Sequence, residues 1–187
     1  AQASLTPNLE ADLPKYSLSG KNIMFVPQKL ISDGRCGVSA QEQSVGYNVF
    51  DFLKEENATL VLGQHFDKVN DLPKVEEIKK EFNAYVPGDT ENPEVFGIRR
   101  VAHKMYWNLY NQVNACIGIA GTHTWYLLAC FPQTPQIILY NKKGVENWEK
   151  ISKAYQAAGH KIFVLGFDEN TNLESLKKDI MELYKKL

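Results

Sequence analysis

The chain reads ACIGIAGTHTWYLLAC over residues 115–130, and this passage indicates the class of fold. The first six residues are apolar or glycine, which is typical of a strand buried on both faces. A turn at Gly121 and Thr122 follows. The pattern predicts a short helix that begins near His123 or Thr124 and ends at Pro132. A buried strand that passes through a tight turn into a helix is the repeating unit of a parallel α/β sheet.

The same alternation of strands and helices continues on both sides of this passage. We predict short apolar strands at 22–26, 59–63, 83–86, 115–120, 136–140 and 161–165. We predict helices at 39–57, 74–82, 95–113, 145–158 and 173–187, the fourth followed by Gly159 as a terminating glycine. Such strands between helices imply a parallel sheet covered on both faces. The predicted fold is therefore a single doubly wound, mostly parallel, Rossmann-like α/β domain over residues 21–187, with residues 1–20 as an N-terminal arm or linker.

Composition excludes several classes of protein. The chain has 187 residues, with 21 Lys and Arg against 22 Asp and Glu, so its formal net charge is −1. A domain that binds nucleic acid through bulk electrostatics would show a basic excess, so no nucleic-acid partner is expected. No apolar run approaches the roughly 18 residues of a membrane span, so no transmembrane segment is expected. The chain begins with Ala1, which suggests a processed chain or a fragment of a longer one.

The three cysteines indicate neither a disulfide framework nor a metal site. No CxxC pair or Cys/His cluster surrounds Cys36, Cys116 or Cys130, so we expect no metal and no cofactor. Sparse thiols are typical of a reduced, cytoplasmic protein. Cys116 and Cys130 lie in apolar stretches and are predicted to be buried.

In a doubly wound sheet, ligands bind beyond the carboxyl ends of the strands, so the loops there are the candidate site. The first strand leads to Gln28, Lys29 and Arg35, two cations and an amide suited to a phosphate. The second strand leads to Gln64, a candidate for hydrogen bonds to a sugar or base. Ordinary solvated loops are the alternative for both. The phosphate-binding patterns GxGxxG and GxxxxGK[ST] are absent.

The strand at 115–120 leads into the most specific of these loops. Gly118 lies in the strand and Gly121 in a tight turn after it, and the expected helix start offers N–H groups to an anion. Thr122 and Thr124 are predicted either to cap the helix or to bind a phosphate oxygen, and His123 to donate to a phosphate or a sugar hydroxyl. After the next strand, Glu146 is expected in the first helical turn. It would there either accept ribose hydroxyls or stabilise the helix dipole.

The passage from Tyr110 to Asn141 resembles the C-terminal, donor-binding lobe of GT-B glycosyltransferases, particularly the heptosyltransferase-like branch. The resemblance consists of a helix, a strand, a Gly-Thr-His turn, a short helix and then PQIILYN. It implies metal-independent transfer from a nucleotide-sugar donor, with His123 acting in catalysis. It also implies that Lys29, Arg35 and the N–H groups of residues 121–124 offset the charge of the diphosphate leaving group. Those enzymes typically carry an acidic residue and Ser-Gly before the histidine, whereas this chain has Ile119, Ala120, Gly121 and Thr122 there.

The chain is about half as long as a two-lobed enzyme of that class. An acceptor-binding lobe, which would normally supply the general base, is therefore expected in a partner chain or a longer protein. Two other functions remain open. A stand-alone nucleotide hydrolase or N-ribosyl enzyme would need its own nucleophile or base, for which Glu42, Asp67 and Glu146 are candidates. The other alternative is a domain that binds its ligand without catalysis.

Overall fold

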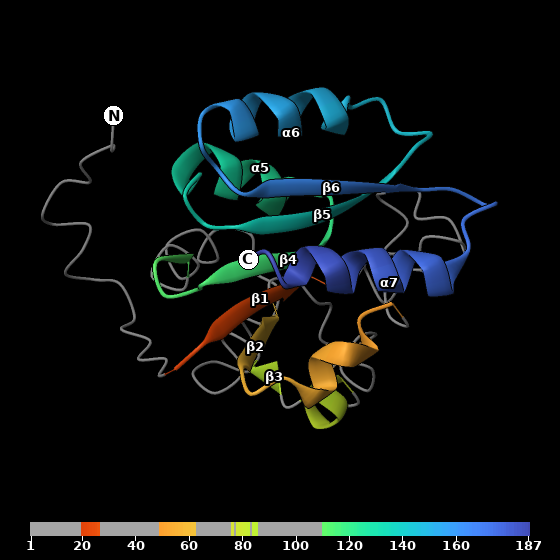
Figure 1. Ribbon diagram of the computed structural model, residues 1–187. Coiled ribbons are helices and arrows are strands. Elements are labelled where there is room, and N and C mark those ends of the chain that lie inside the picture. The colour runs from red at the N-terminus through yellow and green to blue at the C-terminus, as the bar shows by residue number, and fades with distance from the viewer. Residues whose placement is uncertain (1–19, 27–48, 63–75, 77, 83, 86–109) are drawn as a thin grey trace, which may run out of the picture.

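The computed structural model describes residues 20–26, 49–62, 76, 78–82, 84–85 and 110–187 (Figure 1). These residues contain a six-stranded sheet. Its strands are β1 (Asn22–Val26), β2 (Thr59–Leu62), β3 (Ala84–Tyr85), β4 (Ala115–Ile119), β5 (Gln136–Asn141) and β6 (Ile162–Phe167). The ends of each strand differ from the predicted ends by at most two residues. The short apolar runs therefore located the strands correctly, because most of their described residues are buried in the core.

The strands are arranged in the order β3-β2-β1-β4-β5-β6, and every neighbouring pair is parallel. The chain moves outward from β1 through β2 and β3, then returns to the other side of β1 and continues outward from β4. This is the doubly wound order of Rossmann-like proteins, so the predicted fold class is confirmed. The reversal occurs between β1 and β4, where Val26 is the register partner of Gly118.

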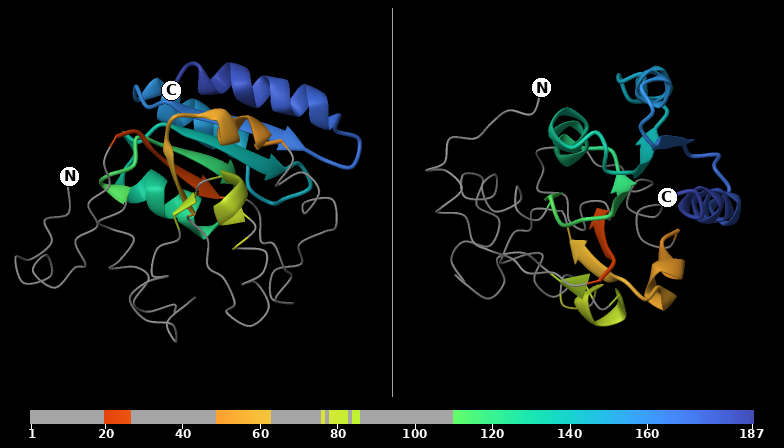
Figure 2. Two further views of the ribbon diagram at one scale, coloured as in Figure 1. Left: turned by 90° about the horizontal axis from the view of Figure 1, so that it is seen from below. Right: turned by 60° about the vertical axis from the view of Figure 1, so that its left-hand side comes forward.

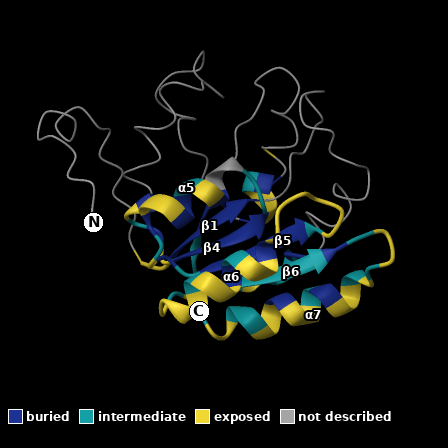
Figure 3. Cartoon of the chain, turned by 90° about the horizontal axis from the view of Figure 1, so that it is seen from above, coloured by how far each residue is buried: buried dark blue, intermediate teal, exposed yellow. Residues whose placement is uncertain are grey.

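Helices cover both faces of the sheet (Figure 2). The helices α5 (Thr122–Cys130) and α6 (Trp148–Ala157) lie on one face. The helix α7 (Leu173–Tyr184) and the 3-10 helix η1 (Asp51–Glu55) lie on the other. Leu176 and Ile180 of α7 share a core with Leu53 of η1 and with the strands beneath. Figure 3 shows that the strands near the middle of the sheet are buried, while α6 and α7 expose their outer faces.

Asparagine caps determine where α6 and α7 begin. The side chain of Asn147 accepts a hydrogen bond from the Lys150 N–H (3.0 Å), so α6 starts at Trp148 rather than at Val145 as predicted. Asn172 caps α7 in the same way through the Ser175 N–H (3.0 Å). Gly159 has a positive φ of 88°, which confirms it as the glycine that follows the helix.

Three other expectations differ from the structure. The end of the predicted helix at 39–57 is the 3-10 helix η1, and the helix predicted to reach Val113 ends at Tyr110. Cys116 is buried as predicted, but Cys130 is exposed because it ends α5 on its outer side. Within the described ranges, no helix is long and apolar enough to cross a membrane.

Candidate functional site

The candidate site begins where β1 and β4 approach each other most closely. A Cβ atom placed on Gly118 would clash with the carbonyl oxygen of Val26 and would lie 2.7 Å from the Val26 Cβ. These contacts are with backbone and with the stem of a branched side chain, so neither can move aside. Glycine is therefore required at position 118, and its absent side chain lets the two strands pack together at the point where the strand order reverses.

From this contact the chain enters the turn that starts α5. The Ala120 N–H donates to Leu139 O (2.7 Å), which holds the beginning of the turn against β5. Gly121 is the N-cap residue, in an extended conformation with φ −171°. The Gly121 N–H donates to Thr124 Oγ1 (3.1 Å), and the Thr124 N–H donates to Gly121 O (2.9 Å). Thr124 is only 2% exposed. Of the two roles considered for Thr124, the structure therefore supports capping of the helix.

The first turn of α5 points its N–H groups toward the carboxyl edge of the sheet. Thr122 and His123 are the first two residues of the helix, and N–H groups at such positions have no acceptor within a helix. The helix dipole adds partial positive charge at the same end. This backbone arrangement is suited to an anion. The side chains of Thr122 and His123 lie outside the described part of the structure.

An aromatic pair lies beside this helix start. Trp125, in the first turn of α5, is 43% exposed, and its ring lies 4.8 Å from that of Trp148 at the start of α6, measured between centroids. Trp148 is buried. The pair joins the two helices that follow β4 and β5, so it fixes the spacing between the loops on this side of the sheet.

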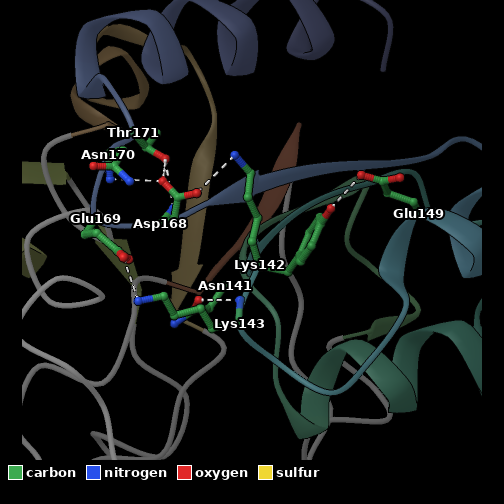
Figure 4. Close-up of polar contacts among 9 residues, drawn as sticks. Asn141, Lys142, Lys143, Glu149, Asp168, Glu169, Asn170 and Thr171 are labelled. Atoms are coloured by element: carbon green, nitrogen blue, oxygen red, sulfur yellow. Dashed lines mark hydrogen bonds and ion pairs between the residues drawn. The ribbon is translucent and has the colours of Figure 1, made fainter.

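A second polar cluster, missed from sequence, lies at the carboxyl ends of β5 and β6 (Figure 4). Lys142 Nζ lies 3.4 Å from Asp168 Oδ2, and Lys143 Nζ lies 2.7 Å from Glu169 Oε1. The Asn170 N–H donates to Asp168 Oδ1 (3.0 Å), and this bond lowers the pKa of Asp168 below its ordinary value. Each lysine that follows β5 is therefore paired with an acid that follows β6.

Gly166 makes room for part of this cluster. A Cβ atom on Gly166 would lie 2.9 Å from Lys142 Cγ and from the Tyr140 hydroxyl, so both side chains lie across β6 at this position. The Tyr140 hydroxyl donates to Glu149 Oε1 (3.0 Å). Burial, and then the hydrogen bond to Glu149, raise the pKa of Tyr140. The sequence did contain a signal for this cluster. Two lysines follow β5 and two acids follow β6, and these strands are neighbours in the sheet.

The structure brings together only some of the predicted site residues. The β4–α5 turn contains Gly118, Gly121, Thr122, His123 and Thr124 in one continuous segment. Glu146 is exposed and precedes the N-cap residue Asn147, so its expected place in the first helical turn was wrong, and Glu149 occupies that turn instead. Six candidate site residues lie outside the part of the chain that the structure describes, namely Gln28, Lys29, Arg35, Gln64, Glu42 and Asp67. Among the residues that are described, no cluster of His, Cys, Asp or Glu could hold a metal ion.

No protein-family model, curated protein or solved structure matches the chain. The function is therefore inferred from the topology of the sheet, from the turn between β4 and α5, and from the sequence.

Proposed function

We propose that this chain binds the diphosphate of a nucleotide sugar and is the donor-binding lobe of a metal-independent glycosyltransferase. The main support is the close contact of Gly118 with Val26, followed at once by the Gly121 turn and the start of α5. These features coincide with the position where the strand order reverses, which is the usual ligand position in such sheets.

In this proposal the diphosphate lies against the first turn of α5. The N–H groups of Thr122 and His123 donate to phosphate oxygens, and His123 donates through its side chain as well. Lys29 and Arg35 supply the positive charge, because Lys142 and Lys143 are already paired with Asp168 and Glu169. Fixed donors at this place offset the negative charge that develops on the leaving diphosphate, which is how they would accelerate transfer without a metal. The acceptor and its general base come from another lobe or a partner chain.

The proposal is tested by thermal unfolding of the chain with nucleoside diphosphates, nucleotide sugars, nucleoside monophosphates and free sugars. A ligand at about 100 times its Kd stabilises the native state by roughly 2.7 kcal/mol, so binding raises the melting temperature measurably. We expect a rise with a nucleoside diphosphate or a nucleotide sugar, and none with the free sugar. The absence of any shift with nucleoside diphosphates at millimolar concentration would overturn the proposal.

Two variants locate the binding. His123→Ala is expected to reduce the shift, because it removes a donor at the start of α5. His160→Ala is the matched control, since His160 precedes β6 and lies at the amino edge of the sheet. Equal loss in both variants would contradict the proposed position. Hydrolysis of the nucleotide by the purified chain alone would instead favour the nucleotide hydrolase or N-ribosyl alternative.

A further inference from the structure

A large aromatic ring is exposed beside the candidate site. Trp125, the fourth residue of α5, is 43% exposed, although Thr124 before it and Leu127 and Leu128 after it are buried. The sites that bind small molecules are lined mainly by apolar and aromatic side chains, with a few polar groups that fix the orientation of the ligand. The start of α5 supplies such polar groups from its backbone, and Trp125 supplies an aromatic surface next to them.

The ring of Trp125 is held in place by Trp148. The two ring centroids are 4.8 Å apart and the ring planes are inclined by 34°. Trp148 is buried and is the first residue of α6, whose start is capped by Asn147. Because Trp148 covers one side of the Trp125 ring, the exposed surface of Trp125 lies on the side away from Trp148. A ring that is already fixed loses little conformational freedom when a ligand packs against it.

The position of Trp125 in the helix brings its ring toward the proposed phosphate site. In an α-helix the Cα–Cβ bonds tilt toward the amino end, so a long side chain lies over the turn that precedes it. For Trp125 this is the turn formed by residues 121–124. The N–H groups of Thr122 and His123, to which the diphosphate is proposed to bind, belong to the same turn. The ring therefore lies beside the place from which the rest of the ligand extends.

We propose that the base of the nucleoside diphosphate stacks on Trp125, an inference that rests on the function proposed above. A base has two flat faces without polar groups, which match an indole ring, whereas a sugar carries hydroxyls that need hydrogen-bond partners. The helix α5 has the sequence THTWYLLAC, which contains no Asp, Glu, Asn or Gln to bind such hydroxyls. Stacking accepts any base, because every base has a π-face. Trp125 therefore favours a nucleoside diphosphate over a bare diphosphate without selecting purine or pyrimidine.

The proposal is tested by calorimetric titration with inorganic pyrophosphate, UDP and ADP. Trp125→Ala should weaken the binding of UDP and ADP by about tenfold and leave the affinity for pyrophosphate unchanged, since only the base contacts the ring. Trp125→Phe keeps an aromatic ring and should retain most of the affinity. Met181→Ala is the control, because it removes a side chain of similar exposure (38%) from α7 and should change no affinity.

Three outcomes would overturn the proposal. The first is unchanged binding of UDP and ADP in Trp125→Ala. The second is an equal loss for pyrophosphate and for the nucleotides, which would mean that the ring only supports the turn. The third is a loss for UDP-glucose without a loss for UDP, which would place the sugar on the ring. If Trp125→Ala does not fold, Trp125→Leu replaces it, because leucine packs on Trp148 without a π-face.

The same titrations distinguish this inference from the function on which it rests. If the native protein binds neither pyrophosphate nor a nucleotide at millimolar concentration, the proposed function fails and the stacking fails with it. If the native protein binds the nucleotides but their affinity does not depend on Trp125, only the stacking is wrong.

Discussion

The hydroxyl of Tyr184, in the last turn of α7, donates a hydrogen bond to Glu56 Oε2 (2.9 Å), in the turn between η1 and β2. The two residues are 128 positions apart in the sequence. Lys21 Nζ donates to the same hydroxyl (2.8 Å), and the Phe52 ring lies 5.5 Å from the Tyr184 ring, measured between centroids. This cluster attaches the end of the chain to the β1–β2 half of the sheet, whereas the rest of α7 packs over the β5–β6 half.

Tyr184→Phe should lower the free energy of unfolding by about 1 kcal/mol at neutral pH, because it removes a hydrogen bond to a carboxylate at a partly exposed position. The difference should depend on pH. Burial, and then the Glu56 carboxylate, raise the pKa of Tyr184 above its ordinary value of 10.0. The contribution of the hydroxyl is therefore fully present below pH 10 and is lost as the pH rises further. Urea unfolding across this range should show the two proteins converging, and a constant difference would contradict this assignment.

Gly118→Ala should be among the most destabilising small substitutions in the sheet. Its new Cβ would meet the backbone of Val26, so β1 and β4 would have to move apart, at a cost of about 2 kcal/mol or more. Gly166→Ala is the matched comparison, because its new Cβ would meet only side-chain atoms of Tyr140 and Lys142 and no backbone. Urea unfolding should show a clearly larger loss for Gly118→Ala. Equal losses would mean that β4 can shift away from β1 without strain.

Local sequence signals were enough to predict the elements that depend on local chemistry. The strands followed from apolar runs, and the end of α6 followed from Gly159, where a positive φ favours glycine. The start of α6 was wrong because Val145 and Glu146 fit a helix as well as their neighbours do. The hydrogen bond of the Asn147 side chain sets the start three residues later than the apolar pattern alone suggests.

Features that depend on the packing of distant segments could not be predicted in the same way. Cys130 was expected to be buried, but the phase of α5 turns Leu127 and Leu128 inward and Cys130 outward. The pairing of Lys142 with Asp168 depends on β5 and β6 being neighbours in a fixed register, which no short motif encodes. The β4–α5 turn was predicted because its glycines, hydroxyls and histidine are consecutive.

Asp168→Asn should destabilise the protein at neutral pH and have little effect in acid. The substitution keeps an oxygen that can accept from the Asn170 N–H but removes the charge that faces Lys142. The Asn170 N–H, with Thr171 and Lys142, lowers the pKa of Asp168 below its ordinary value of 3.8. The contribution of the carboxylate is therefore fully present above pH 3.8 and is lost as the pH falls. Unfolding by urea at several pH values tests this, and a difference that persists unchanged in acid would contradict it.

The two described cysteines should differ in their reaction with iodoacetamide. Complete burial raises the pKa of Cys116 to about 12, so its thiolate is scarce and inaccessible in the native protein. Cys130 is exposed and should be alkylated readily. Mass spectrometry of peptides after mild alkylation should find the label on Cys130 first, and on Cys116 only after unfolding. Early labelling of Cys116 would show that α5 opens from the sheet.

Thr124→Val should loosen the start of α5 and thereby weaken the proposed binding of a nucleoside diphosphate. Valine has nearly the same shape as threonine but leaves the Gly121 N–H without its acceptor, which we expect to cost about 1 kcal/mol in unfolding free energy. Thr124→Ser is the control, because it keeps the hydroxyl. Calorimetric titration with a nucleoside diphosphate should show a weaker Kd for valine than for serine. Equal Kd values with a clear difference in stability would mean that the turn supports the fold without holding the ligand.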